Sequence, residues 1–454
     1  MRQKDFLAIC AVGSREEVEL AIKRGADVNK KAYIYGAKVP PLFVAVMEEN
    51  EEAIKVLLEH GAKTGEGFMA AIVKGKKKLL KLLINLGADV NQKDAGVNGE
   101  NPLFLAVIAN KPKVVKWLIE LGADVNVKSG GGYTPLLYTV IAQMREFNGK
   151  GRIKKIHPDI IASLMKAGAN YDEAMILAVK AGNIPFLDII FKNGADINRK
   201  CWIEGERTAL MSALFSGDKP INAEMVRFLA ENGADVDAVF GLGSDADVLT
   251  NAINISITAE RPDITEILLE NGADPNFCDM TGRTSLVYGV VTDEKIVRLL
   301  LEYGADPNIP DNNKRTPLML AAIDVGIELE IIEALIEHGA DVNAQDNDGM
   351  TALMWAVGSR DREAEFMMSS LIRTGGFMAE GWESWFGLTA IFGAFNREAR
   401  LDTVRLLLRH GADVSIADKK GMNAIACARM NYDDEMVEIL REAAMSKSVD
   451  DYGD

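Results

Sequence analysis

The chain contains 454 residues, 48% of them hydrophobic and only 7% aromatic, and its formal net charge is −16 at pH 7. This composition excludes a polar disordered chain, and no run reaches the roughly 18 apolar residues that span a bilayer. Residues 1–160 carry 25 Lys and Arg against 18 Asp and Glu, whereas residues 161–454 carry 26 against 49, an acidic excess that argues against a nucleic-acid partner because phosphates would be repelled.

The first residues, "MRQKDFLAIC", lack the long apolar core of a secretory signal. The four cysteines, Cys10, Cys201, Cys278 and Cys427, lie far apart and form no Cys-x-x-Cys pair. We therefore expect a reduced, cytoplasmic protein without disulfides and without a zinc site.

One pattern recurs along the chain: an amphipathic helix that ends in Gly-Ala-Asp, as in "IIEALIEHGADVN" at 331–343. The spacings of the turn glycines centre near 33 residues, the period of a helical repeat array. The glycine provides the left-handed residue that ends the helix, and the following Asp and Asn favour a turn. The turn glycines are Gly25, Gly61, Gly87, Gly122, Gly168, Gly194, Gly233, Gly272, Gly304, Gly339, Gly375 and Gly411.

A second helix opening recurs in register with these turns. It reads "NPLFLAV" at 101–107, "RTPLMLAA" at 315–322 and "MTALMWAV" at 350–357. Thr or Asn can cap the helix, and Pro fits its first turn, where no N–H is required. Each unit therefore contains two helices, a turn and a connection to the next unit.

These motifs resemble the ankyrin repeat, whose opening is Thr-Pro-Leu-His-x-Ala, with apolar residues here in the His position. The resemblance implies an all-α solenoid of helix-turn-helix units with β-hairpin fingers. It covers residues 1–445 as one solenoid of about thirteen repeats, with helix pairs as caps at both ends. The segment 446–454 is expected to be an acidic disordered tail.

Two repeats depart from the pattern, since the spacing is only 26 residues between Gly61 and Gly87 and between Gly168 and Gly194. About the length of a finger is absent there, so these two repeats are expected to lack the hairpin. The segment 143–159 is the opposite case, a basic helical insertion loop between the two helices of one repeat.

No constellation of residues indicates chemistry. His60, His338 and His410 occupy the same slot of distant repeats and cannot converge on one metal ion. The Asp residues of the turns are separated by about 10 Å, the spacing of packed helices, and are explained as turn-formers. The sequence thus predicts neither an enzyme nor a cofactor.

Large side chains in the slot after the His position are candidates for partner contacts, because the resemblance implies that partners bind the concave groove and the finger tips. In this slot lie Tyr138, Tyr288, Leu320 and Trp355. Trp and Tyr anchor interfaces more often than other residues. The alternative is that these side chains pack against the neighbouring finger.

Aromatic residues also mark three fingers. Tyr33 in "KKAYIYGAK" and Trp202 in "RKCWIEGER" occupy matching positions, and Trp382 and Trp385 lie in "FMAEGWESWFGL" at 377–388. We interpret them as further partner-binding residues, although the first pair also fits a packing variant of the finger.

The leading hypothesis is a scaffold or adaptor that binds a partner protein, with no nucleic-acid or membrane partner. The alternative is a structural protein that self-associates head to tail, its basic N-terminal third meeting its acidic C-terminal two-thirds.

Overall fold

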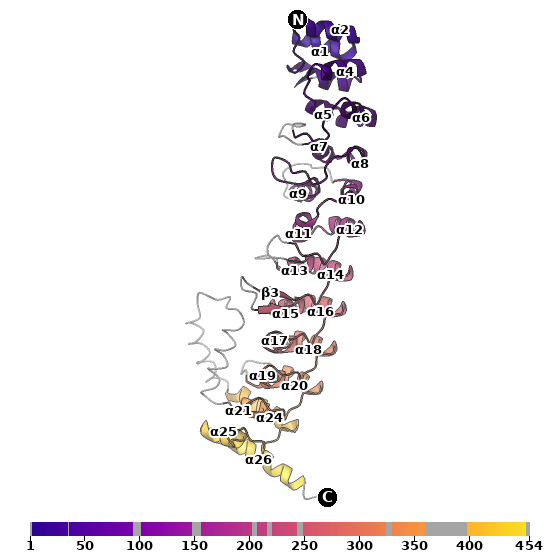
Figure 1. Ribbon diagram of the computed structural model, residues 1–454. Coiled ribbons are helices and arrows are strands. Elements are labelled where there is room, and N and C mark those ends of the chain that lie inside the picture. Colours follow the sequence, from indigo (N-terminus) through magenta and orange to yellow (C-terminus); the bar gives the residue numbers. More distant parts are fainter. Residues whose placement is uncertain are drawn as a thin grey trace. The chain divides into compact units, whose positions relative to one another are not determined.

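The computed structural model describes residues 2–34, 36–93, 101–147, 156–201, 207–215, 220–242, 248–323, 329–358 and 397–450. The chain divides into two compact units, Met1–Pro220 and Ile221–Asp454. Within each unit, antiparallel helix pairs are stacked in chain order (Figure 1). The predicted all-α repeat fold is confirmed.

Within each unit, each repeat begins with a helix that packs on the equivalent helix of the next repeat. In the first unit these first helices are α1 (Gln3–Val12), α3 (Pro41–Met47), α5 (Gly65–Lys74), α7 (Pro102–Ile108), α9 (Pro135–Phe147), α11 (Asp172–Lys180) and α13 (Ala209–Leu214). In the second unit they are α15 (Ala252–Thr258), α17 (Ser285–Val290), α19 (Pro317–Ile323), α21 (Ala352–Val357) and α25 (Ala424–Met430).

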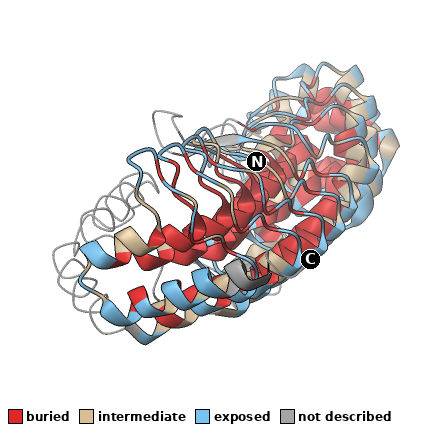
Figure 2. Cartoon of the chain, turned by 90° about the horizontal axis from the view of Figure 1, so that it is seen from below, coloured by how far each residue is buried: buried red, intermediate tan, exposed pale blue. Residues whose placement is uncertain are grey.

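The second helices form the other row of each stack. In the first unit they are α2 (Arg15–Lys23), α4 (Glu51–Glu59), α6 (Lys77–Asn85), α8 (Pro112–Glu120), α10 (Pro158–Lys166) and α12 (Ile184–Lys192). In the second unit they are α14 (Ala223–Glu231), α16 (Pro262–Glu270), α18 (Glu294–Glu302), α20 (Leu329–Glu337), α24 (Arg397–Arg409) and α26 (Asp434–Asp450). Figure 2 shows that the helices are buried where they face one another and exposed on their outer sides.

Every described turn glycine ends its helix in the same way. Their φ angles lie between +79° and +92°, a left-handed region that glycine occupies without a Cβ penalty. The following alanine donates its N–H to the carbonyl five residues earlier, as from Ala340 N to Leu335 O at 3.0 Å. This is the Schellman arrangement, and it satisfies the last carbonyl groups of the helix.

The asparagine two residues after the turn Asp then joins neighbouring repeats. Asn308 Nδ2 donates to Gly339 O at 2.9 Å, and Asn308 Oδ1 accepts from Asp341 N at 2.7 Å. We call this pair of hydrogen bonds the asparagine clamp. The same clamp is made by Asn29, Asn91, Asn126, Asn276 and Asn343.

One clamp joins two turns that are far apart in the sequence. Asn343 bonds Gly411 O at 3.2 Å and Asp413 N at 2.7 Å, so the turn at Gly411 is the spatial neighbour of the turn at Gly339. In the described stack α21 and α24 form one repeat, and no repeat turn stands between these two. Gly375, which the sequence predicts as a further turn between Gly339 and Gly411, lies outside the described residues, and the predicted count of about thirteen repeats is not confirmed.

The fingers follow the sequence expectation. β1 (Ala32–Ile34) pairs with β2 (Ala37–Val39), and β3 (Phe240–Leu242) pairs with β4 (Val248–Thr250), both antiparallel. Three further fingers are closed by single bridges, Cys201–Arg207, Cys278–Thr284 and Ala417–Asn423.

The two short repeats lack this finger, as predicted, because α5 begins four residues after Gly61 and α11 four residues after Gly168. Tyr171 replaces part of the clamp in the second case, since its hydroxyl accepts from Asp196 N at 3.0 Å.

Two segment boundaries in the structure differ from the predicted ones, at the insertion 143–159 and at the C-terminal tail. The insertion 143–159 begins inside a helix, because α9 extends to Phe147, and α10 resumes at Pro158. At the other end α26 extends to Asp450, so residues 446–450, expected to be disordered, are helical.

The clamp gives a stability prediction. Asn308→Ala removes two hydrogen bonds between repeats, so we expect the free energy of unfolding of the second unit to fall by about 1–3 kcal/mol. Denaturant unfolding measures the loss, and hydrogen exchange at Asp341 N, which donates to Asn308, should accelerate.

Asn313→Ala is the matched control, because Asn313 is exposed and its side chain makes no hydrogen bond within the described chain. Equal losses for the two variants would contradict the role given to the clamp.

Candidate protein-binding surface

The candidate surface of the second unit is built around an aspartate at the base of four of its fingers. Asp279 Oδ1 accepts hydrogen bonds from the N–H of Thr281 at 2.7 Å and of Arg283 at 3.0 Å, which closes the finger tip. Asp311, Asp346 and Asp418 close their fingers in the same way. One carboxylate oxygen therefore organises each tip, and the other is available for a side chain.

Tyr288 on α17 uses that second oxygen. Its hydroxyl donates to Asp279 Oδ2, and burial together with this hydrogen bond raises the pKa of the Tyr288 phenol. The ring is half-buried, so one part packs in the repeat while another part reaches the surface. The phenol remains neutral across the physiological pH range.

Trp355 on α21 makes the corresponding contact. Its Nε1 donates to Asp346 Oδ2 at 3.0 Å, and the ring is half-buried like that of Tyr288. In the repeat between them Asp311 Oδ2 instead accepts from Arg315 Nε at 3.0 Å, in an almost fully buried ion pair. Both aromatic rings are thus fixed by their own fingers.

The finger tips are hydrogen-bonded to one another. Asn312 N donates to Thr281 O at 3.0 Å, Asn347 N to Asn313 O at 2.9 Å, and Lys419 N to Asp348 O at 2.9 Å. Four successive tips are therefore joined into one edge.

Two tip glycines are required by this close approach as well as by their positive φ angles. A Cβ at Gly282 would lie 2.6 Å from Asn312 Oδ1, and one at Gly349 would lie 3.0 Å from Lys419 N. A side chain at either position would push neighbouring fingers apart.

Leu320 does not belong to this surface. The sequence places it in the groove slot between Tyr288 and Trp355, but it is only 3% exposed. Unlike Tyr288 and Trp355, the leucine side chain has no polar atom that could donate a hydrogen bond to the finger aspartate. It packs into the core of its repeat instead. The prediction that Leu320 presents a contact surface is wrong.

In the first unit the predicted residues occupy two different settings. Tyr138 is half-buried, and its ring packs on Phe104 of the preceding repeat with the ring centroids 5.1 Å apart. Tyr33 lies on β1 and is 70% exposed. Trp202, Trp382 and Trp385 lie outside the described residues.

Met280 was missed by the sequence reasoning, which considered large side chains in the groove slot but only aromatic residues in the fingers. It lies at a finger tip and is 61% exposed. The corresponding tip positions hold the polar residues Asn312, Asn347 and Lys419, so an apolar residue in this slot was the available signal. Methionine adapts to varied partners because its side chain is flexible and polarizable.

Family profiles match the chain over most of its length. The profile described as ankyrin repeats (3 copies) matches residues 68–147, 153–240, 238–311 and 294–372, and the single ankyrin repeat profile matches 386–419. The chain belongs to the ankyrin-repeat family. No curated protein matches it.

Ankyrin repeats are in general protein–protein interaction modules. Over the ranges that the structure describes, no three His, Cys, Asp or Glu side chains are grouped as metal ligands. No described helix is long and apolar enough to cross a bilayer.

The free cysteines of this ankyrin array differ in accessibility. Burial raises the pKa of the Cys10 thiol to about 12, and burial with the charge of Asp172 raises the pKa of Cys201 to about 11. Both are fully buried, whereas Cys278 is exposed.

We predict that iodoacetamide at pH 8 modifies Cys278 in the folded protein, whereas Cys10 and Cys201 react only after unfolding, because burial withholds their thiolates. Peptide mass spectrometry with and without denaturant measures this difference. Rapid native-state labelling of Cys201 would contradict its placement in the bridge.

The finger aspartate gives a second prediction. Asp346→Asn keeps an oxygen for the tip but places an amide donor opposite Trp355 Nε1, so we expect a loss of about 1–3 kcal/mol in the free energy of unfolding. The Trp355 indole proton should also exchange faster by NMR.

Asp348→Asn, in the same exposed finger, is the control and should change stability by less than about 0.5 kcal/mol. A loss in the control as large as that of Asp346→Asn would indicate a general charge effect instead of a lost hydrogen bond.

Proposed function

We propose that this chain is a scaffold or adaptor that binds a partner protein through the finger tips and first helices of its second unit. The contact residues that we assign are Met280 at a tip and the ring edges of Tyr288 and Trp355. Tyr33 and Tyr138 are the corresponding candidates in the first unit.

The joined finger edge is the observation that carries this proposal. Because four tips are hydrogen-bonded to one another and two rings are held by Asp279 and Asp346, a partner would meet side chains already in place. Binding would then lose little conformational entropy at the surface, which favours affinity.

The chemistry of the surface supports a polypeptide partner. Tyr and Trp with one end bonded and the other exposed can pack against apolar side chains. The adjacent tips are polar, with Asn347 and Lys419 able to contact a partner backbone. This combination of apolar anchors and a polar rim is typical of transient protein interfaces.

The binding test uses the exposed tip so that folding is preserved. A partner captured from the native cell is purified and titrated against wild type, Met280→Asp and Trp355→Phe. We expect Met280→Asp to weaken the Kd at least about tenfold, because it buries a carboxylate in an apolar contact, and Trp355→Phe to weaken it less.

Val73→Asp is the control, since Val73 is 52% exposed on α5 of the first unit and is not among the residues assigned to the contact. A Kd unchanged by Met280→Asp and Trp355→Phe, with circular dichroism spectra like wild type, would show that this surface is not the contact.

A further inference from the structure

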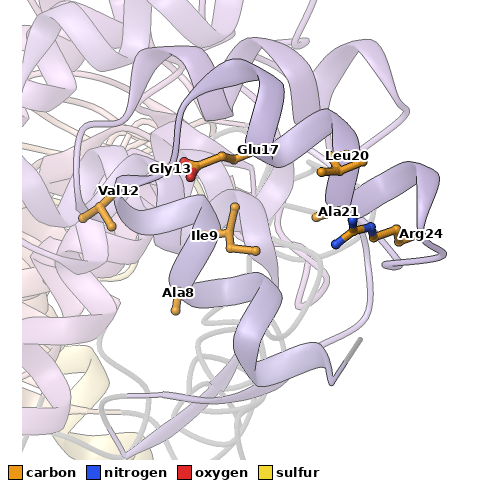
Figure 3. A pocket seen from close by; sticks show the side chains of 8 residues that line it. All are labelled: Ala8, Ile9, Val12, Gly13, Glu17, Leu20, Ala21 and Arg24. Atoms are coloured by element: carbon orange, nitrogen blue, oxygen red, sulfur yellow. The ribbon is translucent and has the colours of Figure 1, made fainter.

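The outer face of the first helix pair is apolar and open. A pocket of about 540 Å³ lies there between α1 and α2, lined by Ala8, Ile9, Val12, Gly13, Glu17, Leu20, Ala21 and Arg24 (Figure 3). Val12 is 87% exposed and Leu20 is 47% exposed. In inner repeats the equivalent face is covered by the preceding helix pair.

The outer face of the last helix pair is also apolar. On α25, Ile425 and Ala426 are only half-buried and Met430 is 70% exposed. Tyr432, beside Met430, is 92% exposed and has a φ of +56°, a strained angle for a tyrosine. The equivalent position in the first repeat holds Gly13.

The first helices show which positions meet when one repeat stacks on the next. Leu7 of α1 and Val44 of α3 belong to one buried cluster, and Ala11 of α1 packs against it. We align the repeats by counting residues back from the N-cap of each second helix. By this count Leu7 and Ala11 in the first repeat correspond to Ala426 and Met430 in the last repeat. The position of Val44 corresponds to Ala8 in the first repeat. If the last repeat of one copy stacked on the first repeat of another, Ala426 and Met430 would therefore meet Ala8, and all three are apolar.

Three internal joints carry an ion pair between neighbouring second helices. A basic residue one or five positions after the N-cap pairs with a glutamate nine positions after the N-cap of the next second helix. Arg15 binds Glu59 at 2.6 Å, Arg227 binds Glu270 at 3.1 Å, and Lys77 binds Glu120.

At the two ends the same slots hold the opposite charges. Lys23 lies nine positions after the N-cap Ser14, in the slot that Glu59, Glu120 and Glu270 fill at these three joints. Asp434 and Glu438 lie one and five positions after Asp433, which caps α26 through a hydrogen bond from Met436 N. These three side chains are exposed, and none forms an ion pair within the described residues.

We propose that the last helix pair of one copy stacks on the first helix pair of a second copy, as one more repeat joint. Met430 and Ala426 then contact the pocket around Ala8 and Val12, and Lys23 lies between Asp434 and Glu438. The opposite charges of Lys23 and of Asp434 with Glu438 make the two end faces complementary to each other.

This contact is heterologous, since each copy contributes two different faces. It can therefore continue from copy to copy. It uses none of the residues that we assign to the finger surface.

The first part of the test reverses the charges on one end face of the chain, and then the charges on both end faces. Light scattering after size exclusion, from about 1 µM to about 300 µM protein, should show assembly of wild type. We expect Lys23→Glu alone, and Asp434→Lys with Glu438→Lys alone, to weaken assembly about tenfold, because like charges then face each other. The triple variant should recover to within about threefold of wild type.

The apolar arm tests the heterologous geometry. Val12→Asp and Met430→Asp should each remain monomeric, because one face of every joint is blocked. Mixed in equal amounts they should form a dimer and nothing larger, since one intact first pair meets one intact last pair. Val73→Asp is the control and should assemble like wild type.

Three outcomes would overturn the proposal. Wild type could remain monomeric at all concentrations, the triple variant could fail to recover, or the mixture could stay monomeric. A dimer formed by Val12→Asp alone would instead identify an isologous contact elsewhere on the molecule. Circular dichroism spectra equal to that of wild type would show that a variant is folded.

Discussion

The asparagine clamp is the interaction on which the structure depends. Each repeat buries its apolar face only against the neighbouring repeats, so the array needs a contact that aligns successive repeats. The Gly-Ala turn ends the second helix with its carbonyl groups satisfied. The clamp then ties that turn to the preceding one through both the donor and the acceptor of a single amide. Because the same geometry recurs in both units, the repeats are held at a constant spacing.

The finger surface is a consequence of this alignment. Once turns are spaced regularly, the finger tips come within hydrogen-bonding distance of one another, and Gly282 and Gly349 permit the approach. The base aspartates use one oxygen for the tip and the other for Tyr288, Arg315 or Trp355. The regular spacing of the repeats thereby fixes the positions of the side chains that we assign to the proposed partner contact.

Much of the fold could be predicted from the sequence, because glycine and proline have strong local preferences. The described turn glycines, the hairpins and the two missing fingers all follow from residues next to them. The neighbour of Asn343 could not be predicted, since the sequence contains the turn motif but not which turn lies beside it. Leu320 and Trp355 share a slot, yet only the structure shows that Asp346 holds the indole at the surface while the aliphatic chain is buried. Met280 was visible as an apolar residue in a polar slot, and an aromatic criterion overlooked it.

The clamp between Asn343 and Gly411 has a consequence for how such an array can change. It recognises whichever turn is nearest in space, whatever the length of chain that separates the two in sequence. The entropy of closing a connection grows only with the logarithm of its length, by about 0.6 kcal/mol for each doubling. Extra segments can therefore be added between two helices of one repeat at small thermodynamic cost. The array is a scaffold that accepts insertions without losing register, and new sequence can be gained there while the repeats on either side remain joined.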